Sequence, residues 1–335
     1  MTTAGIRFGV SFDGFAPVRD AVALACEAEA AGASSFWIAD HVGYRDTLVT
    51  ATAIAGATTK LRVVPTALSP YLRHPTPTAM ALASIAEMAP GRLEVAIGVG
   101  NPLFLQESGH EVVKPVGTLR DYVAALKALW ATQPVEMKGQ TFTLAGAKLA
   151  FAAPYDIPVY LAPMKEQMLK LSGSVGDGLV LSAGLTVNHV RNSLAIAEAG
   201  AVAAGRPFTS LKRAAYIIFI ANEGSGAEAR LLARQKLAFL LRNRFLDDSI
   251  RDSGLPIDQP AIIAAVSRRD LDAATALVPE EAIDAFTVTG DVAGCARRLR
   301  QYLDAGVDEP VLVPTGELAD RRRSLAAARK VASLL

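Results

Sequence analysis

The sequence predicts an α/β fold in which eight short strands alternate with helices and close into a (β/α)8 TIM barrel. Two observations favour this fold: short apolar segments recur along the whole chain, and a helix-like segment follows each of them. Strict alternation implies a parallel sheet that is covered by helices on its outer face. The length of 335 residues suits one barrel with insertions, so we expect a single domain over residues 1–335.

The predicted strands are short apolar segments bounded by glycine, proline or polar residues. They cover residues 6–12, 35–39, 61–67, 93–97, 158–161, 178–181, 212–220 and 310–313. The predicted helices follow apolar periodicity between start and stop signals, such as Pro17 and Gly32 around the first. They cover residues 17–31, 45–58, 76–89, 116–130, 165–174, 187–204, 227–244, 291–305 and 318–335. We also expect a small hairpin at about 133–151 and a partly helical insertion at about 245–285.

The composition excludes several classes of protein. A net charge of +1 gives no electrostatic footprint for nucleic acid. No apolar run approaches the roughly 20 residues of a transmembrane helix, and the N-terminus does not have the pattern of a signal peptide. The two cysteines, Cys26 and Cys295, lie in alanine-rich stretches and are expected to be buried core residues. Such sparse cysteines fit a reducing cytoplasm.

The stretch Phe36-Trp37-Ile38-Ala39-Asp40-His41 is the most informative one, because four apolar residues end in an acid and an imidazole. Functional residues of a barrel lie on the loops after its strands. The alternative reading, in which Asp40 caps the next helix and His41 is a loop histidine, stays open. The other strand ends would bring Ser11, Asp13, residues 66–71, 98–101, 162–165 and 182–184, Thr315 and Gly316 to the same mouth.

This set of mouth residues is poor in metal ligands and nucleophiles. The four histidines never occur at a metal-binding spacing, so we expect no metal. Gly98-Val99-Gly100 follows a strand but lacks the third glycine of a dinucleotide fingerprint. These glycines either relieve crowding at the rim or let the backbone approach a flat ring. A mouth with much bare backbone indicates that a bound organic cofactor supplies the chemistry.

Four motifs follow one another along the chain. They are Trp37-Ile38-Ala39-Asp40-His41 with Tyr44-Arg45-Asp46, then Ser69-Pro70-Tyr71-Leu72-Arg73-His74-Pro75, then Ser84-Ile85-Ala86-Glu87-Met88 with Gly91-Arg92, and finally Lys114-Pro115-Val116-Gly117-Thr118-Leu119-Arg120-Asp121. Together they resemble the bacterial luciferase-like superfamily of flavin and deazaflavin oxidoreductases, and most of all its deazaflavin-dependent methylenetetrahydromethanopterin reductases. The resemblance covers nearly the whole chain and is weakest over residues 245–285.

The resemblance implies a flavin-like ring at the C-terminal mouth of the barrel. A cis peptide bond against the ring centre would map to Thr66-Ala67. Asp40 would contact the cofactor, and His41 would lie on the substrate side and assist proton transfer. The cofactor's phosphate would meet the turn of residues 162–167. The implied cofactor-binding residues are Asp40, Thr66, Ala67, Leu68, Ser69, Gly98, Gly100, Asn101, Ala162, Met164 and Lys165.

Two departures from the family pattern matter. Relatives carry a carboxylate on the first strand where this chain has Ser11. Asp13 lies two residues on and faces the same side of the strand, so it could substitute for that carboxylate. The turn of residues 162–167 lacks the family's glycines, although Lys165 could add charge and helix N-termini offer free amides. We therefore name His41, Asp13 and Ser11 as the candidate catalytic residues.

The expected function is hydride transfer between reduced deazaflavin coenzyme F420 and a small organic substrate with an imine-like or pterin-like carbon. An FMN-dependent luciferase-like monooxygenase is the alternative. A flavin-binding barrel without catalysis and a lyase that forms a Schiff base on Lys165 are further alternatives. We also expect a cytoplasmic homodimer, because the alanine-rich stretch of residues 51–57 could pack against a copy of itself.

Overall fold

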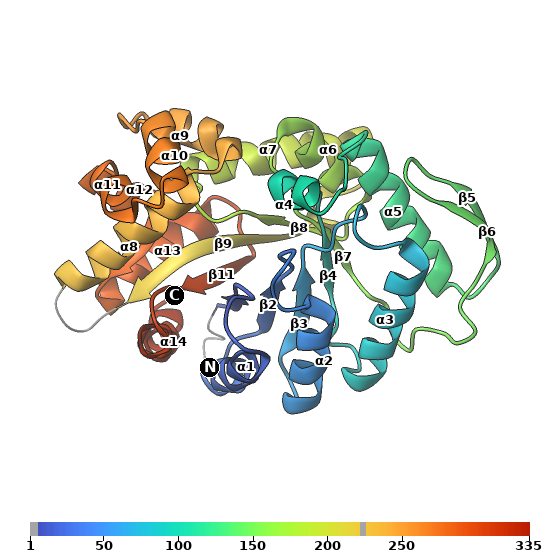
Figure 1. The fold of residues 1–335 in the computed structure, drawn as a ribbon. Helices are drawn as coiled ribbons and strands as arrows, with labels where there is room; N and C mark the ends of the chain where they lie inside the picture. Colours follow the sequence, from blue (N-terminus) through green and yellow to red (C-terminus); the bar gives the residue numbers. More distant parts are fainter. Residues whose placement is uncertain (1–5, 222–225) are drawn as a thin grey trace.

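The computed structural model describes residues 6–221 and 226–335. Its centre is a nearly closed barrel of parallel strands with helices around the outside (Figure 1). The predicted barrel is therefore confirmed. The strand order around the barrel is β3-β2-β1-β11-β9-β8-β7-β4. These strands are β1 (Gly9–Phe12), β2 (Ser35–Ala39), β3 (Arg62–Thr66), β4 (Val95–Ile97), β7 (Val159–Leu161), β8 (Gly178–Leu181), β9 (Lys212–Ala221) and β11 (Glu309–Pro314).

The barrel closes between β3 and β4 through isolated backbone hydrogen bonds. The Leu68 amide donates to the Ala96 carbonyl at 2.9 Å, and the Gly98 amide donates to the Leu68 carbonyl at 3.1 Å. The ladder is interrupted just before these bonds, where the peptide bond between Thr66 and Ala67 is cis. This is the position that the family resemblance implied.

The sequence did not predict two elements of the fold, because each is very short. β10 (Thr287–Gly290) pairs in parallel with the carboxyl half of β9, with Thr287 opposite Ile218. The helix α4 (Pro102–Glu107) follows β4 and lies over the mouth of the barrel. Both contain too few residues for a period to be read from the sequence.

Helices cover the outer face of the barrel, and α9 to α12 gather beside α8 and α13 (Figure 1). Residues 208–210 and 244–246 form short 3-10 helices, and β5 (Val135–Lys138) and β6 (Thr143–Ala147) form an antiparallel hairpin. The α-helices besides α4 are α1 (Val18–Ala30), α2 (Thr47–Ala57), α3 (Pro75–Met88), α5 (Pro115–Trp130), α6 (Glu166–Val175), α7 (Val187–Ala203), α8 (Gly226–Leu241), α9 (Asp247–Ser253), α10 (Gln259–Ser267), α11 (Leu271–Ala276), α12 (Glu280–Phe286), α13 (Val292–Asp304) and α14 (Leu318–Ser333).

The centre of the barrel interior is filled by a cluster of inward apolar side chains. Trp37 lies edge-on to Tyr160 at 5.3 Å between ring centroids, and the cluster also contains Val64, Ala96, Val180, Ala214 and Val311. At the amino ends of the strands, Arg62 bridges Glu94 at 2.8 Å and Glu309 at 2.5 Å. This ionic network closes the bottom of the barrel, so the opposite end is the one that can hold a ligand.

The cysteine prediction is half wrong. Cys295 is buried, as expected, but Cys26 is exposed. The buried positions of α1 are Ala21, Leu24, Ala25 and Ala28, so residue 26 falls outside this stripe. Among the described residues, no helix is long and apolar enough to cross a membrane.

Candidate active site

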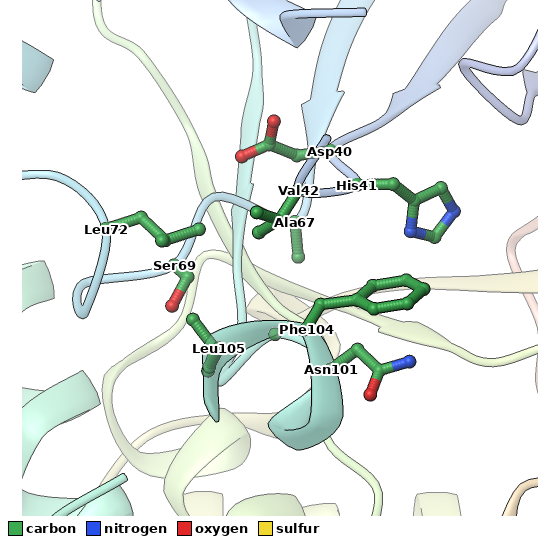
Figure 2. Close-up of a pocket in the computed structure, with 10 residues that line it drawn as sticks. Asp40, His41, Val42, Ala67, Ser69, Leu72, Asn101, Phe104 and Leu105 are labelled. Carbon is green, nitrogen blue, oxygen red and sulfur yellow. The ribbon is translucent and has the colours of Figure 1, made fainter. Parts of the chain in front are cut away.

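A small pocket opens between α4 and the carboxyl ends of β2, β3 and β4 (Figure 2). It brings together six of the residues that the sequence analysis named: Asp40, His41, Ala67, Ser69, Gly100 and Asn101. Its other lining residues were missed, because nothing in their local sequence distinguishes them from core or loop residues. These are Val42, Leu72, Phe104 and Leu105.

Asp40 is held at the pocket by its backbone rather than by a capping role. Its amide donates to the Thr66 carbonyl at 2.7 Å. The cap of α2 is Asp46, whose carboxylate accepts hydrogen bonds from the Leu48 and Val49 amides at 2.9 and 3.0 Å. The alternative in which Asp40 caps the following helix is therefore wrong; its carboxyl group lines the pocket, and the backbone of Thr47 at the start of α2 lies near enough to lower its pKa slightly against the effect of burial.

The environment of Asp40 disfavours its negative charge. Burial raises the pKa of the carboxyl to about 6, and the nearby Asp46 adds to this effect. The charge of Arg73 acts in the opposite direction from 3.8 Å, too far for a hydrogen bond. Asp40 thus titrates within the physiological range. Arg73 was missed as a functional residue, because its approach to Asp40 depends on how the segments after β2 and β3 come together in the fold.

His41 points away from Asp40, toward the side of the mouth near Phe104 (Figure 2). Its imidazole stacks on the ring of Phe15 at 5.3 Å between centroids. Burial lowers its pKa, the nearby cations Lys236 and Arg242 lower it further, and Asp13 opposes them. The imidazole is therefore neutral at pH 7 and is able to accept a proton.

The floor of the pocket is made of small side chains and bare backbone. Gly98 and Ala162 do not line the pocket but lie behind Ala67, because a Cβ atom added at the buried Gly98 would lie 3.0 Å from the Cβ of Ala67 and 3.3 Å from that of Ala162. Gly100 has a φ of +88°, and an added Cβ would lie 3.3 Å from Ser69 Cβ. Such a surface fits a flat ring system, because no side chain projects from it.

Two predicted cofactor contacts lie behind this floor. Leu68 is fully buried in the core, and its backbone closes the barrel. Thr66 is buried as well, and its hydroxyl donates to the Val64 carbonyl at 2.9 Å. Both residues support the pocket without lining it.

Asp13 and Ser11 do not line the pocket either. The carboxylate of Asp13 accepts a hydrogen bond from Arg321 at 2.8 Å and one from the Phe15 amide at 3.2 Å. Burial alone would raise its pKa, but the hydrogen bond and charge of Arg321 outweigh this effect and lower it. Asp13 is thus an ionised neighbour of His41.

Ser11 lies on β1, two residues after Gly9. A Cβ atom added at Gly9 would meet Trp37 inside the barrel, so both positions face inward.

Lys165, which the sequence suggested as a phosphate-binding residue, is instead paired with two carboxylates. Its Nζ lies 2.5 Å from Asp247 and 2.6 Å from Asp248, both on α9. These hydrogen bonds raise its pKa although burial opposes them. The amine is therefore charged and already neutralised, which argues against a Schiff-base lyase. Met164 packs against the core beside this turn, Ala162 lies next to Gly98, and neither residue lines the pocket.

No cluster of His, Cys, Asp and Glu within residues 6–221 and 226–335 is arranged to hold a metal ion. The arrangement that remains is a barrel mouth with a bare floor, one carboxylate of raised pKa and one neutral imidazole. Such a site is suited to binding a planar organic ring and to moving a proton next to it.

The fold and the pocket define a barrel protein with a ligand site at the carboxyl ends of its strands. The chain belongs to the family described as luciferase-like monooxygenase, which matches residues 2–309, so the predicted family is confirmed. The chain is 30% identical over 311 residues to the 5,10-methylenetetrahydromethanopterin reductase of Methanolobus tindarius, covering 91% of this chain and 93% of that protein.

Further similarities extend over nearly the whole chain. It is 27% identical over 345 residues to the F420-dependent glucose-6-phosphate dehydrogenase of Nocardia farcinica, covering 96% of this chain and 94% of that protein. The solved structure of the coenzyme F420 dependent tetrahydromethanopterin reductase from Methanopyrus kandleri matches with a TM-score of 0.89 at 24% identity, covering 98% of each chain. At this identity the structural match establishes the fold.

Proposed function

We propose that this protein is an oxidoreductase that transfers a hydride between reduced coenzyme F420 and a small organic substrate with an imine-like or pterin-like carbon. The observation that carries the proposal is the similarity to F420-dependent relatives over more than nine tenths of the chain. The pocket supports it, because a flat, bare floor beside Asp40 and His41 suits a tricyclic ring.

When bound, the coenzyme supplies the hydride from its ring. The residues of this chain bind, orient and shield the reactants. Ala67, Ser69 and Gly100 would provide the surface that holds the ring, with Gly98 and Ala162 packed behind Ala67, and Asp40 would contribute its carboxyl group from the pocket lining. His41 lies on the substrate side and takes or returns a proton at its imidazole. Leu72, Phe104 and Leu105 make the pocket apolar and exclude water from it.

The test is an anaerobic reaction. We expect the protein to oxidise reduced F420 in the presence of 5,10-methylenetetrahydromethanopterin and in the absence of oxygen. The reaction is monitored through the increase in the absorbance of oxidised F420. The alternative is a monooxygenase that uses reduced FMN, and the family's description favours it. Strict dependence on oxygen, together with tighter binding of FMN than of F420, would support that alternative.

We also propose that the protein is a homodimer that pairs through α2 and α3. The helix α2 contains no charged residue, although it lies on the outside of the barrel. Val49 on α2 is 62% exposed, and Met80 and Met88 on α3 are 48% and 49% exposed. An uncharged helix whose outer face carries exposed apolar side chains is normally covered, so a second copy is the expected cover.

We place the protein in the cytoplasm. The free thiols of Cys26 and Cys295 and the absence of a membrane-crossing helix among the described residues support this location.

A further inference from the structure

Two loops form one wall of the pocket, and Arg73 links them. The loop after β2 supplies residues 40–42 of the lining, and the loop after β3 supplies three more, the last of which is Leu72. Arg73 follows Leu72 directly in the second loop. Its Nη2 donates to Asp46 Oδ2 at 2.7 Å, and Asp46 is the last residue of the first loop. This hydrogen bond therefore ties together two loops that both line the pocket.

The guanidinium of Arg73 lies within reach of two carboxylates but hydrogen-bonds to only one of them. Its Nη2 is 2.7 Å from Asp46 and 3.8 Å from Asp40. Its Nε is buried and has no hydrogen-bond partner among the described residues. A buried donor without a partner is unfavourable, so the guanidinium retains a donor with which it could bind Asp40 instead. The contact of Arg73 with Asp46 therefore competes with a contact to Asp40.

Asp46 is held so that it keeps this contact. Its Oδ1 accepts hydrogen bonds from the Leu48 and Val49 amides at 2.9 and 3.0 Å, while its Oδ2 accepts the one from Arg73. Burial would raise the pKa of Asp46, but these hydrogen bonds outweigh it and lower the pKa. Asp46 is therefore ionised at neutral pH. Its negative charge holds Arg73 and disfavours a second negative charge on Asp40.

The other titratable groups near Asp40 do not neutralise its charge. Burial raises the pKa of Asp40, and the cation that opposes this effect is Arg73. Tyr122 on α5 stays neutral, because burial raises its pKa to about 12, and its hydroxyl donates to Thr78 Oγ1 at 2.8 Å. His41 points away from Asp40 (Figure 2). The place of the Arg73 guanidinium therefore decides how readily Asp40 ionises.

We propose that Arg73 is a positioning residue that acts through Asp40. By its division between Asp46 and Asp40, it sets whether Asp40 presents a hydrogen-bond donor or a negative charge to a bound ligand. A neutral carboxyl group donates to a carbonyl oxygen or a ring nitrogen, whereas a carboxylate accepts from an N–H group. The consequence for the coenzyme rests on the proposed function, whereas the control of the Asp40 charge does not.

Two substitutions move this balance in opposite directions. Arg73→Met removes the cation and should raise the midpoint of the Asp40 titration by about one pH unit. Arg73→Gln, which keeps a donor for Asp46 without the charge, should give the same rise. Asp46→Asn removes the neighbouring negative charge and releases the guanidinium for Asp40, so the midpoint should fall by about one pH unit. Asparagine caps a helix as well as aspartate does, so this variant keeps the cap of α2.

The measurement is the titration of Asp40 by NMR of its ¹³C-labelled carboxyl group, with Asp40→Asn identifying the signal. Arg73→Lys keeps the charge and should keep a midpoint near that of the wild type. The matched control is Asp258→Asn, because Asp258 is also an exposed N-cap, which accepts from the Ala261 amide at 2.9 Å on α10. This control should leave the midpoint unchanged.

A merely structural role for Arg73 predicts a different result. Arg73→Met and Asp46→Asn both weaken the link between the two loops, so loosening of the wall would shift the midpoint of Asp40 in the same direction in both variants. Shifts in the same direction would overturn the proposal. It would also be overturned if either variant kept the wild-type midpoint.

Titration with F420 across the pH range separates this proposal from the proposed function. The pH at which F420 affinity changes should follow the midpoint of Asp40 in the wild type, in Arg73→Met and in Asp46→Asn. Failure of F420 to bind the wild type would count against the proposed function, while the NMR titration would still test the role of Arg73. F420 binding whose pH dependence ignored the Asp40 midpoint would overturn the link between Arg73 and the coenzyme.

Discussion

Arg73 lies 3.8 Å from the carboxylate of Asp40, and its closer contact, at 2.7 Å, is with Asp46. The guanidinium therefore stabilises the cap of α2 through a hydrogen bond and reaches Asp40 only through space. Because Arg73 does not hydrogen-bond to Asp40, the effect of burial on the carboxyl group outweighs that of the Arg73 charge, and the pKa of Asp40 rises to about 6. The carboxylate at the pocket is poised to change its charge near neutral pH.

The first prediction concerns the pH dependence of stability. The pKa of Asp40 rises from its ordinary value of 3.8 to about 6 in the folded protein. Asp40 therefore contributes its full stabilisation of the folded state below pH 3.8 and loses this contribution as the pH rises through 6. Asp40→Asn mimics the protonated form. It should raise the free energy of unfolding at pH 8 by roughly 1–3 kcal/mol, and by less at pH 5. Urea unfolding at both pH values measures this, with the exposed Asp304→Asn as the control. An equal effect at both pH values would contradict the assignment.

The second prediction concerns His41. His41→Gln should leave F420 affinity nearly unchanged and slow the single-turnover rate by about 100- to 10,000-fold, the range of general acid–base assistance. Because burial and nearby cations lower the pKa of His41 below 6.5, the acid limb of the wild-type rate should lie below this pH. This limb should vanish in His41→Gln and persist in Asp40→Asn. The control is the exposed His110→Gln.

Substitution of Asp13 tests whether His41 transfers a proton without help from that carboxylate. Its negative charge raises the pKa of His41, so Asp13→Asn should move the acid limb further down in pH. The double variant combines Asp13→Asn with His41→Gln. If its rate loss differs strongly from the product of the two single losses, Asp13 and His41 share a proton relay. If the losses simply multiply, Asp13 acts only as a structural partner of Arg321.

The third prediction concerns the pocket floor. In Gly98→Ala the new methyl group would lie 3.0 Å from Ala67 Cβ and 3.3 Å from Ala162 Cβ, so the floor must shift. We expect a loss of about 1–3 kcal/mol in the free energy of unfolding, as for other overpacked cores, and weaker F420 binding. Adding Ala67→Gly to this variant removes the shorter contact and should recover part of both. A Gly98→Ala protein with wild-type stability and affinity would show that the floor tolerates a side chain.

The fourth prediction concerns Lys165. Its amine is bound by Asp247 and Asp248, and all three side chains are more than a third exposed or close to it. Lys165→Met should change the free energy of unfolding by less than about 1 kcal/mol, as is usual for exposed ion pairs. It should change F420 affinity less than about threefold, because the amine has no free charge to offer a phosphate. A tenfold loss of affinity in a coenzyme titration would restore the phosphate-binding role.

The sequence predicted what depends on local pattern and missed what depends on long-range pairing. The apolar run that ends at Asp40 and His41 located the pocket, because strand ends converge at a barrel mouth. The pairing of Asp13 with Arg321 joins residues 308 positions apart, and no local signal could announce it. The same holds for Lys165, whose partners lie 82 and 83 positions away. Cys26 was misplaced because an alanine-rich helix gives a weak distinction between its inner and outer faces.

The last prediction concerns the dimer. Val49 is 62% exposed on a helix without charges, and Val202 is 66% exposed on α7, so they are matched in residue type and exposure. If α2 pairs with a second copy, Val49→Glu would bury a carboxylate in an apolar interface, which is unfavourable without a partner. We expect light scattering at micromolar concentration to give a dimer for the wild type and for Val202→Glu, and a monomer for Val49→Glu. The thermal midpoint of the wild type should rise with protein concentration, because association stabilises the folded state by mass action, and that of Val49→Glu should not. A monomeric wild type, or a Val49→Glu protein that remains dimeric, would show that α2 is not the interface.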